Sequence, residues 1–246
     1  IIFNLLSRYD EEDSTSVPDK LRNPDLRKNA QKIGGPWHLF KKGVEAEVLE
    51  NFKESLEKFE KAGYEIVDIE LPHAQYSLAV YYIIMPAEVS TNLSRFDGIR
   101  YGYSANKEVD NLKDVYMKSR GKGFGKEARR RILLGTYVLS HGYYDAYYNK
   151  AVKVREKIKE EIINTFKNVD FILTPTAPMT AFKIGEKMDD PVAMYLCDIF
   201  SAPANLSGVP SLALPSGVSS IGLPFSIQFM APHFREDLLF EVGKKF

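Results

Sequence analysis

The stretch Tyr195–Met230 constrains the fold most, because proline and glycine interrupt it too often for a long helix. Two short apolar runs, Ser211–Leu214 and Phe225–Met230, lie between these interruptions. Short apolar runs bounded by Gly and Pro are typical of buried strands, since a helix needs a longer uninterrupted period. The sequence therefore predicts two adjacent core strands joined by a tight loop at Ser216–Gly222, with helices from the preceding sequence covering them.

The preceding sequence alternates between amphipathic helices and short apolar strands. The clearest helix is Val44–Ala62, whose apolar residues recur every three or four positions, and Gly63 follows where a left-handed C-terminal cap belongs. A strand is expected at Tyr64–Leu71. The same order recurs as a helix at Tyr144–Phe166 and a strand at Val169–Leu173. This alternation predicts an α/β fold with helices on both faces of a sheet.

Two more helices are expected in the middle of the chain. Ala74–Leu93 has a helical pattern in which Pro86 removes one backbone donor, so we expect a kink or a restart there. A glycine-rich loop at Gly121–Gly125 precedes a helix at Lys126–Ser140. Near the N-terminus, residues 33–36 predict a short strand and its exit turn.

The composition is that of an ordinary globular protein, with 44% hydrophobic and 27% charged residues. The 33 basic and 33 acidic residues balance, so no global charge draws the chain to nucleic acid or membrane. The single cysteine, Cys197, excludes an internal disulfide framework and fits a reducing compartment such as the cytoplasm or an organellar matrix. No apolar run reaches the length of a membrane span, and the first residues do not resemble a signal peptide.

Both ends have helical patterns without terminating signals. The chain begins with Ile-Ile-Phe-Asn-Leu-Leu and stops at Phe246 with no glycine or proline after the pattern. We therefore expect the sequence to be part of a longer chain.

Few residues suggest nucleophilic or metal chemistry. Gly217–Ile221 approaches the pattern of a nucleophile elbow around Ser219 and Ser220, but isoleucine stands where that pattern needs glycine. Both serines are therefore interpreted as loop residues, and Cys197 as a small buried residue. The four histidines lack metal-ligand spacing and are interpreted as surface or packing residues. They are His38, His73, His141 and His233.

A basic segment, Lys118–Arg131, holds seven lysines and arginines and one acid, Glu127. Its glycines do not form a phosphate-binding loop pattern. Two interpretations remain open: a solvated helix face with a flexible loop, or a contact with RNA phosphate or with a protein partner.

Six segments of the chain carry a resemblance to a known family: DSTS (Asp13–Ser16), YYIIMPAEVSTNLSRFDGIRYGY (Tyr81–Tyr103), RRILLGTYVLSHGYYDAYY (Arg130–Tyr148), DFILTPTAP (Asp170–Pro178), NLSGVPSLALPSG (205–217) and GLPFSIQ (222–228). Together they resemble the amidase signature family, and within it the A subunits of glutamyl-tRNA(Gln) amidotransferases. The resemblance implies an α/β/α sandwich around a mixed sheet, of which residues 1–246 are the C-terminal part of a single amidase domain. The family's glycine- and serine-rich signature, with its catalytic serines and an upstream lysine, is not found in the sequence.

For the intact protein, the resemblance implies glutamine hydrolysis that supplies ammonia for converting Glu-tRNA(Gln) to Gln-tRNA(Gln). The B and C subunits of the amidotransferase are the implied partners; the B subunit carries ATP and Mg²⁺ and makes most of the tRNA contacts. This chain is expected to bind no cofactor of its own and to be inactive alone. Two alternatives are another amide hydrolase of the same family and a non-catalytic module that binds RNA or a protein partner.

The resemblance places glutamine recognition at Tyr82, Arg131 and Asp198. Arginine can pair both carboxylate oxygens of an amino acid, a carboxylate suits its ammonium group, and a tyrosine hydroxyl adds a directional hydrogen bond. From the residues alone, Tyr82 can also be a core residue, Arg131 part of the basic face, and Asp198 a local cap. The neighbouring Tyr81 and Arg130 are alternative assignments.

Overall fold

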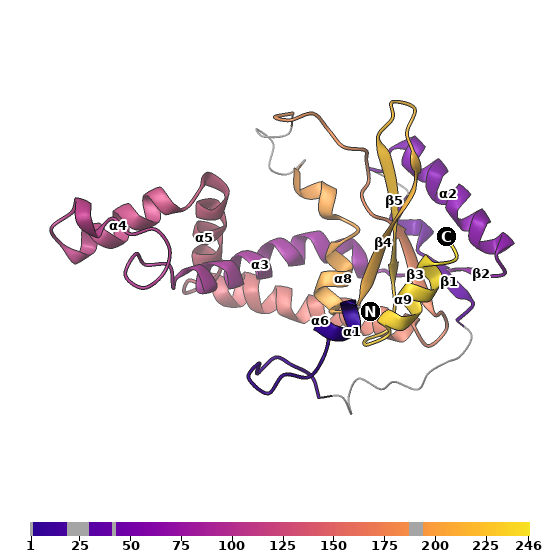
Figure 1. Ribbon diagram of the computed structural model, residues 1–246, viewed down its shortest axis with the longest axis horizontal. Coiled ribbons are helices and arrows are strands. Elements are labelled where there is room, and N and C mark those ends of the chain that lie inside the picture. Colours follow the sequence, from indigo (N-terminus) through magenta and orange to yellow (C-terminus); the bar gives the residue numbers. More distant parts are fainter. Residues whose placement is uncertain (1, 19–29, 41–42, 187–193) are drawn as a thin grey trace. The chain divides into compact units, whose positions relative to one another are not determined.

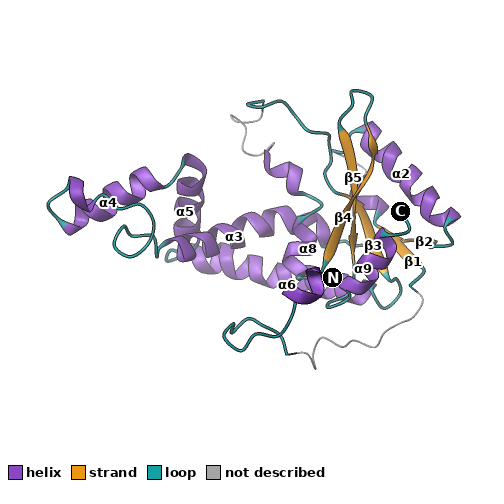
Figure 2. Cartoon of the chain, viewed as in Figure 1, coloured by secondary structure: helices purple, strands orange, loops and turns teal. Residues whose placement is uncertain are grey.

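The computed structural model describes residues 2–18, 30–40, 43–186 and 194–246. The chain forms two compact units, which are considered separately. The sheet unit comprises Ile1–Ala74 and Lys159–Phe246, and the helical unit comprises Gln75–Ile158. All strands of the described residues belong to the sheet unit (Figures 1 and 2).

The sheet is mixed and has five strands in the order β2-β1-β3-β5-β4. β1 pairs in parallel with both β2 and β3, whereas β5 pairs antiparallel with both β3 and β4. This arrangement confirms the predicted α/β class with a mixed sheet. The strands are β1 (Lys32–Gly35), β2 (Glu65–Asp68), β3 (Phe171–Pro175), β4 (Ser211–Val218) and β5 (Pro224–Met230).

β4 and β5 form the predicted pair of neighbouring strands as an antiparallel hairpin. The ladder extends to Val218, so the connection is shorter than the expected loop at Ser216–Gly222. Among the strands of the described residues, β4 lies at the edge of the sheet and alternates between exposed and half-buried residues over its first five positions, so the prediction of a buried core strand is wrong for β4. The edge position accommodates Pro215, which has no N–H to donate, and the register shifts between Pro215 and Gly217.

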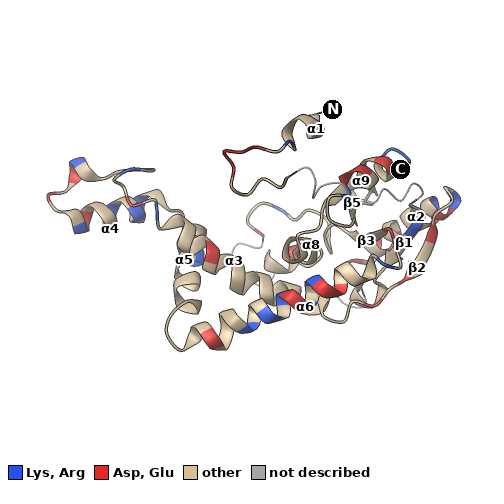
Figure 3. Cartoon of the chain, turned by 90° about the horizontal axis from the view of Figure 1, so that it is seen from below, with Lys and Arg blue, Asp and Glu red and all other residues tan. Residues whose placement is uncertain are grey.

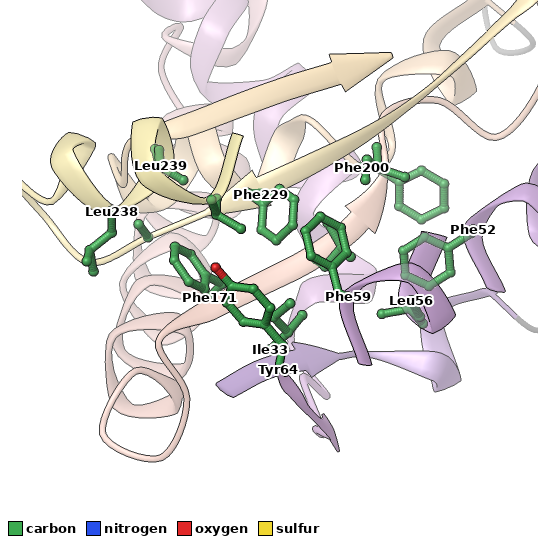
Figure 4. Packing of buried hydrophobic residues seen from close by; sticks show 14 of the residues in the cluster. Ile33, Phe52, Leu56, Phe59, Tyr64, Phe171, Phe200, Phe229, Leu238 and Leu239 are labelled. Atoms are coloured by element: carbon green, nitrogen blue, oxygen red, sulfur yellow. The ribbon is translucent and has the colours of Figure 1, made fainter. Parts of the chain in front are cut away.

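The main core lies on the face of the sheet covered by α2 (Ala46–Lys61) and α9 (Glu236–Gly243) (Figure 4). Phe229 of β5 packs edge-on against Phe59 of α2 and Phe171 of β3, with ring centroids 5.1 and 5.6 Å apart. Ile172 alternates to the opposite face and is also fully buried. Both faces at the centre of the sheet are therefore covered.

α2 confirms the clearest predicted helix, including its terminating glycine. Gly63 has φ +92°, and its N–H donates to Glu60 O while Tyr64 N–H donates to Phe59 O. These two bonds form the Schellman arrangement, in which glycine takes the left-handed position. The Phe59 and Tyr64 rings also meet edge-on at 5.6 Å. The helix end therefore places the chain directly into β2.

α3 (Ser77–Leu93) continues through Pro86, so the helix does not restart there, and the alternative of a kink stays a prediction. Its neighbour α5 (Lys126–Val138) packs so closely that a Cβ atom at Gly135 would lie 1.9 Å from Pro86 O. The glycine-rich loop expected at Gly121–Gly125 is largely helical, because α4 (Leu112–Gly123) continues to Gly123.

The remaining elements of the described residues are α1 (Ile2–Leu6), the 3₁₀ helices η2 (Trp37–Phe40), η3 (Ala74–Tyr76), η4 (Asn106–Glu108) and η6 (Leu196–Asp198), the π-helical η5 (Tyr144–Asn149), and the α-helices α6 (Lys150–Thr165) and α8 (Ala202–Ser207).

Candidate functional site

The helical unit places two predicted recognition residues on neighbouring helices, Tyr82 on α3 and Arg131 on α5. The Arg131 guanidinium Nη1 donates to Met85 Sδ at 3.1 Å. Met85 follows Tyr82 by three positions and therefore lies on the same side of α3. The Arg131 guanidinium thus reaches the turn of α3 that carries Tyr82.

Gly135 allows the two helices to approach this closely. It lies one turn after Arg131 on the buried face of α5, and a Cβ atom there would meet Pro86 O at 1.9 Å and Ser90 Cβ at 2.6 Å. A hydrogen bond of 3.0 Å between the Ser90 and Thr136 hydroxyls joins the helices at the same level. The absent side chain at Gly135 therefore determines how near Arg131 comes to α3.

Glu127 holds the two adjacent arginines of α5. Arg131 Nε donates to Glu127 Oε1 at 2.9 Å, and Arg130 Nη1 donates to Glu127 Oε2 at 3.0 Å. The side chain of Arg131 is 29% exposed and that of Arg130 is 45% exposed. Ion pairs of this spacing on a helix contribute only about 0.3–0.5 kcal/mol to stability, so the main effect of Glu127 is to orient the two arginine side chains.

The chemistry around Arg131 suits a carboxylate ligand. A thioether is a weak acceptor, whereas a carboxylate accepts two parallel bonds from a guanidinium. A ligand carboxylate that replaced the Met85 contact would therefore gain a much stronger interaction than the one it displaced. Tyr82 is half-buried, and its ring packs edge-on against Tyr81 with centroids 5.2 Å apart.

Asp198, the third predicted residue, belongs to the sheet unit, where it ends the 3₁₀ helix η6. Its backbone carbonyl accepts hydrogen bonds from Ser201 N and Ser201 Oγ, both at 3.1 Å. Two residues later, Phe200 is buried in the core and its carbonyl accepts a bond of 3.0 Å from Gln228 Nε2. These contacts fix the backbone around Asp198. Only Tyr82 and Arg131 are therefore brought together within one unit.

The two loop serines have structural partners in the β4–β5 hairpin. Ser219 Oγ accepts from Leu223 N at 3.0 Å and so closes the turn. Ser220 Oγ donates to Glu47 Oε1 at 2.6 Å, and this bond lowers the pKa of the Glu47 carboxyl. In the part of the chain that the structure describes, neither hydroxyl is hydrogen-bonded to a histidine or lysine side chain. Their geometry is that of hairpin residues.

Two of the histidines, His73 and His38, also have local partners. His73 Nδ1 lies 2.5 Å from Glu161 Oε2, and the same carboxylate accepts from His73 N. His38 Nε2 accepts from Leu71 N at 3.3 Å. Among residues 2–18, 30–40, 43–186 and 194–246, no group of three His, Cys, Asp or Glu is arranged to hold a metal ion. No helix within these same ranges has both the length and the apolar character for crossing a bilayer.

Sequence reasoning missed Met85 and Gly135, the two residues that set Arg131 against α3. In the sequence, Glu127 stands out only as the one acid in the basic segment, although its spacing of four residues from Arg131 indicates a helical ion pair. The one signal for Met85 is its spacing from Tyr82. Nothing in the local sequence identifies Gly135 as a contact point, because that contact is made by a residue 49 positions away, Pro86.

Comparison with known proteins agrees with this architecture. The amidase family matches residues 1–240. The A subunit of the glutamyl-tRNA(Gln) amidotransferase of Dechloromonas aromatica is 46% identical over 250 residues, which cover 100% of this chain and 51% of that protein. Its counterpart from Thiobacillus denitrificans is 45% identical over 249 residues, again covering 100% of this chain and 51% of the relative. The chain thus spans about half the length of these curated relatives.

Solved structures show the same fold. A crystal structure of the A subunit of the Thermotoga maritima glutamyl-tRNA(Gln) amidotransferase is 38% identical with a TM-score of 0.70, over 96% of this chain and 47% of that one. Kluyveromyces lactis allophanate hydrolase is 18% identical with a TM-score of 0.73, over 99% of this chain and 36% of its own, which shows a shared fold. The family match over nearly the whole chain agrees with the resemblance found in its motifs. The chain belongs to the amidase family.

Proposed function

We propose that this chain is the C-terminal part of an A subunit of a glutamyl-tRNA(Gln) amidotransferase. In this proposal the intact protein hydrolyses glutamine, and the ammonia converts Glu-tRNA(Gln) to Gln-tRNA(Gln). The observation that carries the proposal is the guanidinium of Arg131, which reaches the turn of α3 that carries Tyr82. Identity of 46% to a curated A subunit over the whole chain supports it.

In this proposal Tyr82 and Arg131 of the helical unit bind glutamine, and Arg131 pairs with the α-carboxylate through two parallel hydrogen bonds. For Asp198 of the sheet unit, pairing with the α-ammonium group stays a prediction from the family resemblance. The Tyr82 hydroxyl supplies a hydrogen bond that fixes the orientation of the ligand. Recognition of both charged groups favours a free amino acid over a neutral amide.

Both arginines pair with Glu127, but Arg131 is preferred over Arg130 because its guanidinium also contacts Met85 and its side chain is less exposed. Tyr82 is preferred over Tyr81 because it precedes Met85 by three positions, the spacing of one helical turn.

The chain's part in catalysis is to hold the substrate while an acyl-transfer nucleophile acts on the side-chain amide. Positioning of the reacting group accounts for much of the rate of such reactions. The sequence lacks the glycine- and serine-rich signature, and Ser219 and Ser220 serve the hairpin. The nucleophile is therefore assigned to family residues outside these 246, and the chain alone is proposed to be inactive.

The partners in this proposal are the B and C subunits of the amidotransferase. Activation of the glutamyl-tRNA with ATP and Mg²⁺ is assigned to the B subunit, which also makes most of the tRNA contacts. The curated relatives are themselves named as A subunits, which supports an assembly of several different chains.

Glutamine binding to the 246-residue chain tests the proposal, measured by isothermal titration with L-glutamine. Arg131→Lys keeps the charge but removes the planar fork, and we expect it to weaken binding about 10- to 100-fold, the worth of a charged hydrogen bond. Arg130→Lys is the matched control, because Arg130 has the same partner, Glu127, and is expected to leave the affinity unchanged. Equal affinities of the two variants would refute the assignment of Arg131.

A further inference from the structure

The outer face of α5 exposes large apolar side chains. Leu133 is 71% exposed, Leu134 41% and Tyr137 48%. Gly135 and Val138, on the other side of the same helix, are buried, and Gly135 packs on α3. Single exposed leucines are common on proteins, but adjacent ones on one helix face form a patch.

Basic side chains continue this apolar patch toward the start of the helix. Lys126, Arg129, Arg130, Leu133 and Leu134 together line a shallow hollow of about 510 Å³, and we call these five residues the α5 outer face. Lysines and arginines of α4 and α5 are drawn in blue in Figure 3. The positions follow the spacing of one helical stripe, with cations on the first turns and leucines on the next.

Two cations of the α5 outer face have no carboxylate within ion-pair distance among the described residues. Arg130 is paired with Glu127, whereas no ion pair is formed there by Lys126 or Arg129. The face therefore offers positive charge at one end and apolar surface at the other. A complementary ligand has acidic groups beside apolar groups at helical spacing.

This combination favours a protein over RNA. Phosphate groups can pair with the cations, but they have no counterpart for Leu133 and Leu134. Single-stranded RNA is bound mainly by aromatic stacking beside basic residues. The hollow is lined by leucines and cations, and the exposed Tyr137 is not among its lining residues. An amphipathic helix meets both requirements, because its apolar side chains fill such a hollow and its flanking acids pair with the rim.

We propose that the α5 outer face is a docking surface for an acidic amphipathic helix of a partner polypeptide. Acidic residues of that helix pair with Lys126 and Arg129, and its apolar residues pack on Leu133 and Leu134. The surface is separate from the proposed glutamine site, since Arg131 is directed at Met85 of α3. The inference goes beyond the proposed function and can fail or hold independently of it.

The test uses a synthetic helical peptide of about five turns with leucine along one side and glutamate on both flanks. The peptide carries a fluorescent label, and its binding to the 246-residue chain is followed by anisotropy. We expect saturable binding that Leu133→Ser and Arg129→Glu each weaken by about tenfold or more, as for loss of a buried anchor or of a charge pair. The double variant Lys126→Glu/Arg129→Glu should instead bind a version of the peptide with lysine in place of glutamate.

Matched controls separate this surface from general charge effects and from the glutamine site. The double reversal Lys53→Glu/Lys61→Glu on α2 makes the same change of net charge at exposed positions and should leave peptide binding unchanged. Arg131→Lys should also leave it unchanged. Absence of saturable binding, equal affinities for all variants, or tighter binding of an oligouridylate of similar length would overturn the proposal. Far-UV circular dichroism checks that each variant is folded.

Discussion

Replacing Gly135 with alanine tests the packing that places Arg131 against α3. The new Cβ atom would lie 1.9 Å from Pro86 O and 2.6 Å from Ser90 Cβ. A carbon–oxygen contact normally needs about 3.3 Å, so α5 would have to move from α3 by roughly 1.4 Å. Pro86 O cannot yield on its own, because it belongs to the backbone of a helix.

The expected cost follows from two opposing effects. Overpacking costs about 1–3 kcal/mol, whereas alanine exceeds glycine in helix propensity by about 1 kcal/mol. The difference between these terms predicts that Gly135→Ala lowers the free energy of unfolding by up to about 2 kcal/mol and the midpoint of thermal unfolding by up to about 8 °C. Thermal unfolding followed by far-UV circular dichroism measures this change.

Gly121→Ala provides a matched control on α4. A Cβ atom there meets no other atom within 4 Å, so only the propensity effect applies and we expect stabilisation of up to about 1 kcal/mol. The two variants should therefore shift the midpoint in opposite directions. Gly135→Ala should also weaken glutamine binding, since Arg131 lies one turn away, while Gly121→Ala should not. A Gly135→Ala variant as stable as Gly121→Ala would refute the close approach of the helices.

Two further substitutions test contacts elsewhere in the molecule. Asn51→Ala should lower the free energy of unfolding, measured by urea titration, by about 1–3 kcal/mol. The reason is that the buried hydroxyl and carbonyl of Ser216 both lose Asn51 as their hydrogen-bond partner. A change near zero would contradict the importance of these two hydrogen bonds. A hydrogen bond with Tyr143 raises the pKa of Tyr137 from 10.0 to about 12, so Tyr143→Phe should return it toward 10.0 in a ring-carbon NMR titration. Because the pKa of Tyr137 is raised in the folded state, the stabilisation from this hydrogen bond is present below about pH 10 and is lost as the pH rises through about 12. An unchanged titration of Tyr137 in the Tyr143→Phe variant would show that Tyr143 does not cause the raised pKa.

Periodicity predicted the elements whose partners are close in sequence. Val44–Ala62 and Gly63 predicted α2 and its end, because helix spacing and the left-handed glycine are local properties. Sequence reasoning also predicted that β4 and β5 are neighbours, because two strands joined by a tight turn pair with each other as a hairpin.

The errors concern properties that depend on distant contacts. Whether β4 is central or at the edge depends on the strand order, which its own residues do not encode. The continuation of α3 through Pro86 was not evident from its own residues, and Gly135 of α5 packs against this part of the helix. For the candidate site, the family resemblance suggested Arg131, but only the structure places its guanidinium against Met85. Local sequence patterns therefore predicted the helices and strands, whereas the packing between them is seen only in the structure.

These 246 residues are proposed to recognise glutamine without supplying the nucleophile that attacks it. Release of ammonia from L-glutamine by the purified chain, at a glutamine concentration that saturates binding in titration, tests both parts of this proposal at once. We predict bound glutamine that stays intact, with no release above that of the Ser219→Ala/Ser220→Ala double variant. Sustained release that this double variant abolishes would contradict the proposal.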